Sequence, residues 1–240
     1  WKMYGSSETI RALLSDLSRV VSEPASCSVG VFPPAPYLSV AQALLKDTPF
    51  YWGAQNVFPA DQGAYTGEIA GPMLIDFGCH FVLIGHSERR QYFHETDAFI
   101  AEKVAYVKTQ GLIPVLCIGE SDAERQQELT ETVLERQLSV VAKHSEAGLS
   151  GCIIAYEHLW AIGSGKSASP SQVQAVHAWI RQWLFEKVPA VAQQTSLLYG
   201  GSVTPDNAQA LGELPDVDGV LVGGASLDAA RFGRIIQCIN

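Results

Sequence analysis

The chain has 240 residues, of which 47% are apolar, so it can bury the core of one large domain or of two small ones. Its formal net charge of −9 at pH 7 argues against a general binder of nucleic acids or of acidic membranes. No apolar run is long enough to span a bilayer, so we expect neither a nucleic acid nor a membrane as partner.

The chain has five cysteines, which are scattered and form no CxxC pair. Three of them lie in or beside apolar, strand-like runs. Buried free thiols therefore fit this pattern better than disulfides or a metal site do. Free thiols persist in a reducing compartment, so we expect a cytoplasmic protein. The cysteines are Cys27, Cys79, Cys117, Cys152 and Cys238.

Strand and helix patterns alternate along the whole chain. The first part predicts a helix over residues 10–21, a strand over 28–32, a helix over 39–46, a strand over 50–53, a long loop over 55–70 and a strand over 81–84. The middle predicts a helix around 100–107, a strand over 113–118, a helix over 123–143 and a strand over 152–156. The last part predicts a helix around 173–184, a strand over 196–199, a short helix after Pro205, a strand over 219–222 and a helix over 229–239.

This order favours an α/β fold of the (β/α)8 TIM barrel type, with residues 1–240 forming a single domain. No linker or change of composition divides the chain. A closed barrel needs one more strand, ahead of the first helix, and we expect that this first strand is missing from the sequence. An open doubly wound sheet is the alternative, but the regular repeat and the length favour the barrel.

One acidic residue, Glu157, stands at the end of a strand that reads as buried on both faces, residues 152–156. A loop with an apolar tip between two glycines follows it, and a helix start follows at Ser169 and Pro170. A carboxylate beneath such a flap is the arrangement that proton transfer shielded from water requires. An acid at a strand end more often caps or pairs with a charge, and the flap that follows Glu157 is what favours the catalytic interpretation within this segment.

Two further patterns point to chemistry at the strand ends. His86 follows the strand over 81–84 and precedes what looks like a helical turn, whose positive end favours a neutral imidazole. Glycine pairs follow the last two predicted strands, at residues 200–201 and 223–224. Backbone N–H groups of such turns bind phosphate in many barrels, although a single pair would more simply be a turn.

Nine segments in the same order make the sequence resemble the triosephosphate isomerase family over essentially its full length. They are residues 1–6 (WKMYGS), 53–57 (GAQNV), 66–68 (TGE), 84–90 (IGHSERR), 117–120 (CIGE), 155–157 (AYE), 160–163 (WAIG), 199–203 (YGGSV) and 222–226 (VGGAS). The resemblance implies a glycolytic and gluconeogenic isomerase that interconverts dihydroxyacetone phosphate and D-glyceraldehyde 3-phosphate through an enediolate. It implies no metal and no organic cofactor.

The resemblance also implies roles for individual residues. Glu157 would be the general base, His86 the neutral electrophile and Lys2 the cation that neutralises phosphate and enediolate charge. Glu88 matches the family's buried acid near that lysine, where a structural ion pair is as good an interpretation as a supporting catalytic role.

Substrate binding and assembly are implied in the same way. Lys2 and four residues of the glycine-bearing turns would hold the phosphate, and closure of the lid over residues 160–163 would shield the reaction. The four are Gly163, Ser202, Gly223 and Gly224. The long loop over 55–70 inserts into a second subunit in this family, so a homodimer is implied, with Gln55 and Thr66 at the interface.

Two substitutions depart from the family pattern: Tyr4 stands where asparagine is common, and His158 replaces the proline that usually follows the base. Losing proline could loosen the first hinge of the lid, or the packing around residue 158 could have adapted to histidine. Two other functions remain open. One is another phosphate-binding barrel such as an aldolase, which would need a Schiff-base lysine at a central strand end. The other is a catalytically impaired relative that acts as a binding or structural barrel protein.

Overall fold

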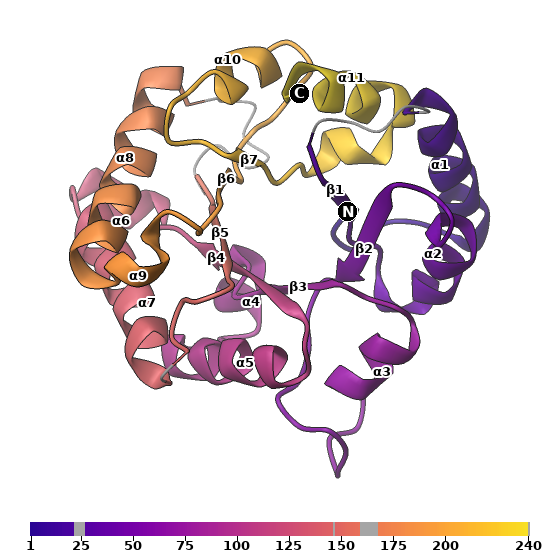
Figure 1. Cartoon of the computed structure of the whole chain (residues 1–240), viewed down its shortest axis with the longest axis horizontal. Helices are drawn as coiled ribbons and strands as arrows, with labels where there is room; N and C mark the ends of the chain where they lie inside the picture. The colour runs from indigo at the N-terminus through magenta and orange to yellow at the C-terminus, as the bar shows by residue number, and fades with distance from the viewer. Residues whose placement is uncertain (22–26, 146, 159–167, 240) are drawn as a thin grey trace.

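Parallel strands form one sheet in which each strand pairs with the next along the chain. The computed structural model describes residues 1–21, 27–145, 147–158 and 168–239. Figure 1 shows the strands curling around a common centre with the helices outside them. The strands within the described ranges are β1 (Val29–Val31), β2 (Phe50–Ala54), β3 (Phe81–Ile84), β4 (Ile113–Ile118), β5 (Ile153–Tyr156), β6 (Leu197–Tyr199) and β7 (Gly219–Val220).

The outer helices begin where the sequence offers capping groups. Ser6 and Thr9 form a capping box at the start of α1, and Ser169 with Pro170 opens α8. The longer helices are α1 (Ser7–Val20), α2 (Leu38–Leu45), α5 (Asp97–Thr109), α7 (Thr130–His144), α8 (Pro170–Lys187) and α11 (Ala229–Ile239). The short ones are η1 (Ala35–Tyr37), α3 (Gly71–Asp76), α4 (Ser87–Tyr92), α6 (Asp122–Gln126), α9 (Pro189–Ala192), α10 (Ala208–Gly212) and η3 (Gly224–Leu227).

The single helix expected over residues 123–143 is wrong. The chain forms α6 and α7 instead, because Glu128 adopts a left-handed conformation (φ 56°) that no helix can continue through. The short helices α3 and α9 were not predicted, and β7 ends at Val220 rather than at residue 222. The other expected strands and helices are present, with ends that differ by a few residues.

The two outer strands of the sheet, β1 and β7, face the same apolar cavity of about 480 Å³. Val29 and Val31 line it from β1 and Val220 lines it from β7, with Trp1 beside them. The sheet therefore curls back on itself, as an α/β barrel does. No strand precedes α1 in the described residues 1–6, so the expected first strand is not among them.

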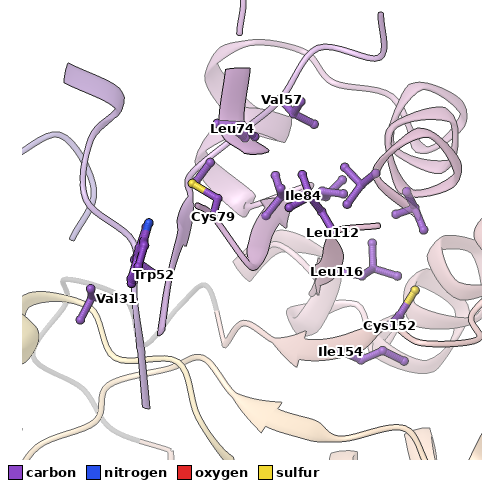
Figure 2. Packing of buried hydrophobic residues seen from close by; sticks show 14 of the residues in the cluster. Val31, Trp52, Val57, Leu74, Cys79, Ile84, Leu112, Leu116, Cys152 and Ile154 are labelled. Carbon is purple, nitrogen blue, oxygen red and sulfur yellow. The ribbon is translucent and has the colours of Figure 1, made fainter. Parts of the chain in front are cut away.

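The strands bury both faces, as their apolar runs predicted. Leu83, Val115 and Ala155 belong to a cluster of inward-facing residues. Alternate residues such as Ile84, Leu116 and Ile154 belong to the larger core beneath the helices (Figure 2). Packing on both faces holds the strands in position, and with them the carboxyl ends at which the candidate site lies.

Three cysteines support the expectation of buried thiols. Cys79, Cys117 and Cys152 are free and buried. None of the helices in the described ranges combines the length and apolar character that crossing a membrane requires.

Candidate active site

The carboxylate of Glu157 lies at the carboxyl end of β5, and the residue is only 2% exposed. Its N–H donates to the carbonyl of Ile118 at the end of β4 (2.8 Å). Its side chain accepts two hydrogen bonds from Ser87, one from the backbone N–H to Oε2 (2.8 Å) and one from the hydroxyl to Oε1 (3.0 Å). These bonds compensate the buried negative charge and fix its direction.

The imidazole of His86 touches the same carboxylate. His86 follows β3 and caps α4, where its Nδ1 accepts a hydrogen bond from the N–H of Glu88 (3.2 Å). Because Nδ1 is an acceptor, the ring proton of a neutral imidazole lies on Nε2. Nε2 lies 3.0 Å from Oε1 of Glu157, and the His86 side chain keeps 16% exposure. A neutral N–H donor and a carboxylate thus stand side by side.

Lys2 joins this group through Glu88. Its Nζ lies 2.6 Å from Oε1 of Glu88, and the two side chains are 28% and 41% exposed. The expected acid near the lysine is therefore present, but its side chain is partly exposed rather than buried. A continuous series of contacts runs from Lys2 through Glu88 and His86 to Glu157.

The backbone of Lys2 is strained. Its φ of 53° lies in the left-handed region, which costs a non-glycine residue about 1–3 kcal/mol. The side-chain amide of Gln55 donates to the carbonyl of Lys2 (2.9 Å) and also to that of Phe32 (2.8 Å). Gln55, expected at a subunit interface, thus holds Lys2 within its own chain; the expected interface role stays a prediction.

The glycine-bearing turns after β6 and β7 lie at neighbouring strand ends. Ser202 follows β6, and its carbonyl accepts from the amide of Asn207 (2.9 Å). Gly223 and Gly224 follow β7, and a Cβ on either would meet no atom within 4 Å. Open space thus lies over these backbones. The remaining expected phosphate ligand, Gly163, and the lid over 160–163 fall outside the described residues.

The segment between β2 and α3 projects away from the rest of the molecule (Figure 1). Thr66 is exposed on this segment. Its neighbour Tyr65 is 49% exposed, and Met3 and Tyr4 near the N-terminus are 93% and 59% exposed. Within the described ranges, no hydrogen bond or ion pair joins the Thr66 side chain to Glu157, whose partners are Ser87 and His86.

Sequence reasoning missed the contact of Ser87 with Glu157 and the contact of Arg125 with His158, the residue after Glu157. Ser87 lies inside the segment 84–90, but its pairing with an acid 70 residues away has no local signal. His158, noted only as a replaced proline, is fully buried and accepts a hydrogen bond from Arg125 (3.2 Å). These contacts favour the interpretation that the packing around residue 158 has adapted to histidine.

The thiol of Cys117 lies in the barrel interior near Glu157. Burial, and secondarily the charge of Glu157, raise the pKa of Cys117 well above its ordinary value. A thiol that stays protonated is a packing group, not a nucleophile. In the part of the chain that the structure describes, no three His, Cys, Asp or Glu side chains gather as a metal site would need.

Comparison with known proteins gives matches to one family. The family model described as triosephosphate isomerase matches residues 1–239. A triosephosphate isomerase of Legionella pneumophila (strain Lens) is 45% identical over 240 residues, which cover 100% of this chain and 96% of the relative. Those of Photorhabdus laumondii and Histophilus somni are 48% and 47% identical over 238 residues, which cover 99% of this chain and 93% of each relative.

These matches extend over nearly the whole of each sequence and include the segments that carry Lys2, His86 and Glu157. The chain belongs to the triosephosphate isomerase family.

Proposed function

We propose that the protein is an isomerase that interconverts dihydroxyacetone phosphate and D-glyceraldehyde 3-phosphate, with Glu157 as base, His86 as electrophile and Lys2 as charge stabiliser. The observation that carries these roles is the 3.0 Å contact between Nε2 of His86 and Oε1 of Glu157. Proton abstraction beside a carbonyl needs a carboxylate and a donor to the carbonyl oxygen within reach of one small substrate. The family membership supports the same reaction.

The proton moves as follows. Glu157 takes a proton from the carbon next to the carbonyl, and the electrons of that C–H bond form the enediolate. The N–H of His86 donates to the substrate oxygens and stabilises the negative charge on them. Glu157 then returns the proton to the neighbouring carbon. Nε2 of His86 gives its proton to the former carbonyl oxygen and takes the proton of the neighbouring hydroxyl, which completes the exchange of aldehyde and ketone and restores the neutral imidazole. The mechanism uses groups of the protein alone.

The phosphate would lie over the turns after β6 and β7. Ser202, Gly223 and Gly224 offer backbone N–H groups there, and open space over both glycines supports close approach of an anion. Lys2 adds the positive charge that a protein of net charge −9 must supply locally. Gly163 completes the proposed set from outside the described residues.

A homodimer is part of the proposal. Two features support it: the projecting segment between β2 and α3, and the exposed apolar side chains of Met3, Tyr4 and Tyr65. Exposed apolar surface of this kind is typical of a protein–protein interface. We place Gln55 and Thr66 at or next to that interface. We likewise propose that residues 1–240 form one barrel domain and that the protein works in the cytoplasm.

The alternative, a catalytically impaired barrel kept for binding or structure, has less support. The series of contacts from Lys2 to Glu157 is intact, and a binding protein would have no need of it. An aldolase has less support as well, since a Schiff base needs a lysine at a central strand end. In the described ranges the most buried lysine, Lys103, lies on α5 and is paired with Glu95.

A coupled assay of glyceraldehyde 3-phosphate isomerisation tests the proposal, with Glu157→Asp measured beside the unsubstituted protein. Shortening the base by one methylene should lower kcat about a hundredfold or more, which corresponds to roughly 3 kcal/mol of transition-state stabilisation. Glu135→Asp, at an exposed glutamate of α7, is the matched control and should retain full activity. A folded dimer without isomerase activity would support the impaired-relative alternative instead.

A further inference from the structure

The backbone on either side of Glu157 is held in two different ways. Before the base, the sheet holds it, because Tyr156 pairs with Ile118 of β4 and with Tyr199 of β6. The N–H of Gly200 also donates to the carbonyl of Tyr156 (2.7 Å). Strand β5 ends at Tyr156, so beyond the base the strand pairing no longer fixes the chain.

After the base, the side chain of His158 anchors the chain by a hydrogen bond with Arg125. His158 is 0% exposed, and Nη1 of Arg125 donates to its Nε2 at 3.2 Å. A guanidinium can only donate, so Nε2 must be the unprotonated nitrogen and the ring proton lies on Nδ1. The imidazole ring also packs edge-on against Tyr156, with ring centroids 4.8 Å apart.

The same nitrogen of Arg125 also connects to the residue before the base, through Glu120. Nη1 lies 3.1 Å from Oε1 of Glu120, a carboxylate that is fully buried. The hydroxyl of Tyr156 donates to both oxygens of that carboxylate, at 2.9 Å each. Tyr156, Glu120, Arg125 and His158 therefore form a closed ring of contacts that spans Glu157 from the residue before it to the residue after it.

We propose that His158 is a positioning residue for Glu157: its neutral imidazole accepts a hydrogen bond from Arg125 and so ties the residue after the base to the Glu120–Arg125 pair that already holds the residue before it. The inference rests on the proposed role of Glu157 as base. It predicts that the acceptor at Nε2, and not merely an aromatic ring of that shape, sets where the carboxylate stands.

Two observations support this role: the imidazole is neutral, and the backbone between Glu157 and His158 is tightly packed. Burial, the charge of Arg125 and the neighbouring His177 lower the pKa of His158 to about 3, so the ring accepts from Arg125 at any pH near neutrality. The carbonyl of Glu157 also lies close against Gly119, where a Cβ would come within 2.3 Å of it. Because the backbone has no free space there, a displacement of residue 158 would also displace Glu157.

Two substitutions of His158 separate the acceptor from the ring. His158→Phe keeps the ring and removes the acceptor, whereas His158→Gln places an amide oxygen where Nε2 stands. We expect His158→Phe to lower kcat about tenfold with KM changed by no more than about twofold, because a displaced base weakens only the chemical step. His158→Gln should recover most of that loss.

The chain offers a matched control in His177. It is also 0% exposed, packs edge-on against Tyr156 and donates from Nδ1 to the carbonyl of Val173 (2.9 Å), but it lies on α8, away from the base. His177→Phe should affect thermal stability and leave kcat within about twofold of the unsubstituted value. Equal losses of kcat in His158→Phe and His177→Phe would overturn the inference in favour of a general packing effect.

A kinetic isotope effect distinguishes positioning from loss of structure. With substrate deuterated at the transferred hydrogen, a misplaced base makes proton abstraction more rate-limiting, so the isotope effect on kcat should rise in His158→Phe and return in His158→Gln. A loss of folded protein would lower kcat and leave the isotope effect unchanged. An unchanged kcat and isotope effect in His158→Phe would refute the inference.

Two further variants complete the test. If His158→Phe does not fold, Arg125→Lys tests the same hydrogen bond. The shorter lysine cannot reach Nε2 of His158 but still places a positive charge near Glu120. A kcat equal to that of the unsubstituted protein would equally refute the inference. Glu157→Gln tests the proposed function separately. If Glu157→Gln is active, the role of the base is wrong; if Glu157→Gln is inactive and His158→Phe is normal, only the role of His158 is wrong.

Discussion

Nε2 of His86 and Oε1 of Glu157 lie 3.0 Å apart, although one residue follows β3 and the other follows β5. Nδ1 of the same imidazole accepts from the N–H of Glu88, so the nitrogen that faces the carboxylate is the one that carries the proton. The groups proposed to remove the substrate proton and to polarise the carbonyl are therefore neighbours before any substrate arrives. A bound substrate must separate them by placing its oxygen between the N–H and the carboxylate.

Replacing His86 by glutamine should test the donor half of this pair. A glutamine amide can donate from nearly the position of Nε2 but polarises an oxygen more weakly, so we expect His86→Gln to lower kcat about a hundredfold or more. The measurement is the steady-state rate of glyceraldehyde 3-phosphate isomerisation. His144→Gln, at an exposed histidine of α7, is the control. If His86→Gln lowered kcat no more than His144→Gln does, the electrophile would have to be another group.

Gln55 offers a test of how Lys2 is held. Its amide donates to the carbonyls of Lys2 and Phe32, and a carboxylate at this position could donate to neither. Gln55→Ala should lower the free energy of unfolding by about 1–3 kcal/mol, and Gln55→Glu should lower it further and reduce kcat/KM more strongly. Unfolding in urea and the isomerase assay measure both effects.

The concentration dependence of the Gln55 variants separates two roles. A loss caused by displaced Lys2 should be the same at every protein concentration, whereas a loss caused only by a weakened dimer should vanish when the protein is concentrated. Gln193→Glu, at an exposed position after α9, is the charge-matched control. Full recovery of Gln55→Glu at high concentration would assign Gln55 to the interface alone.

The elements that the sequence predicted best are those whose pattern is local. Strand β3 was expected over residues 81–84 and lies there, because four apolar residues between turn signals are too few for a helix and fit a buried strand. The break between α6 and α7 could not be predicted, since nothing in the composition of this segment marks Glu128 as left-handed. The φ angle of this one residue ends α6 and separates it from α7.

The site, too, has a part that the sequence predicts and a part that it does not. Glu157, His86 and Lys2 were identified from segments that the family shares, and contacts link all three. The bonds from Ser87 to the base and from Arg125 to His158 join residues 70 and 33 positions apart, and neither pair has a spacing that would reveal it. The sequence indicates the groups that we propose to react, and only the fold reveals the groups that orient them.

Gly224 provides a test of the proposed phosphate site. Its surroundings are open, so Gly224→Ala should fold with unchanged thermal stability, but the added methyl group would occupy space that the phosphate needs. We expect KM for glyceraldehyde 3-phosphate to rise about tenfold or more. Gly30→Ala on β1, where a Cβ meets only ordinary contacts from 3.8 Å, is the control. An unchanged KM in Gly224→Ala would move the phosphate away from this turn.

The buried His158 should make stability depend on pH in a defined window. Its pKa is lowered from 6.5 to about 3 by burial, by the charge of Arg125 and by His177. Between these two values the unfolded chain binds a proton that the folded chain does not, so the free energy of unfolding falls as the pH falls from about 6.5 toward 3. From pH 7 to pH 5 this one group should cost about 2 kcal/mol.

The variant His158→Gln isolates that contribution, because glutamine keeps an acceptor for Arg125 and does not titrate. The pKa of His177 is also lowered by burial, so both proteins share its effect and the difference between them removes it. Urea unfolding at about pH 7 and about pH 5, at one protein concentration, should show a loss about 2 kcal/mol larger for the unsubstituted protein. Equal losses in the two proteins would mean that His158 takes up its proton in the folded chain without difficulty, and Arg125 would then have to move away from it.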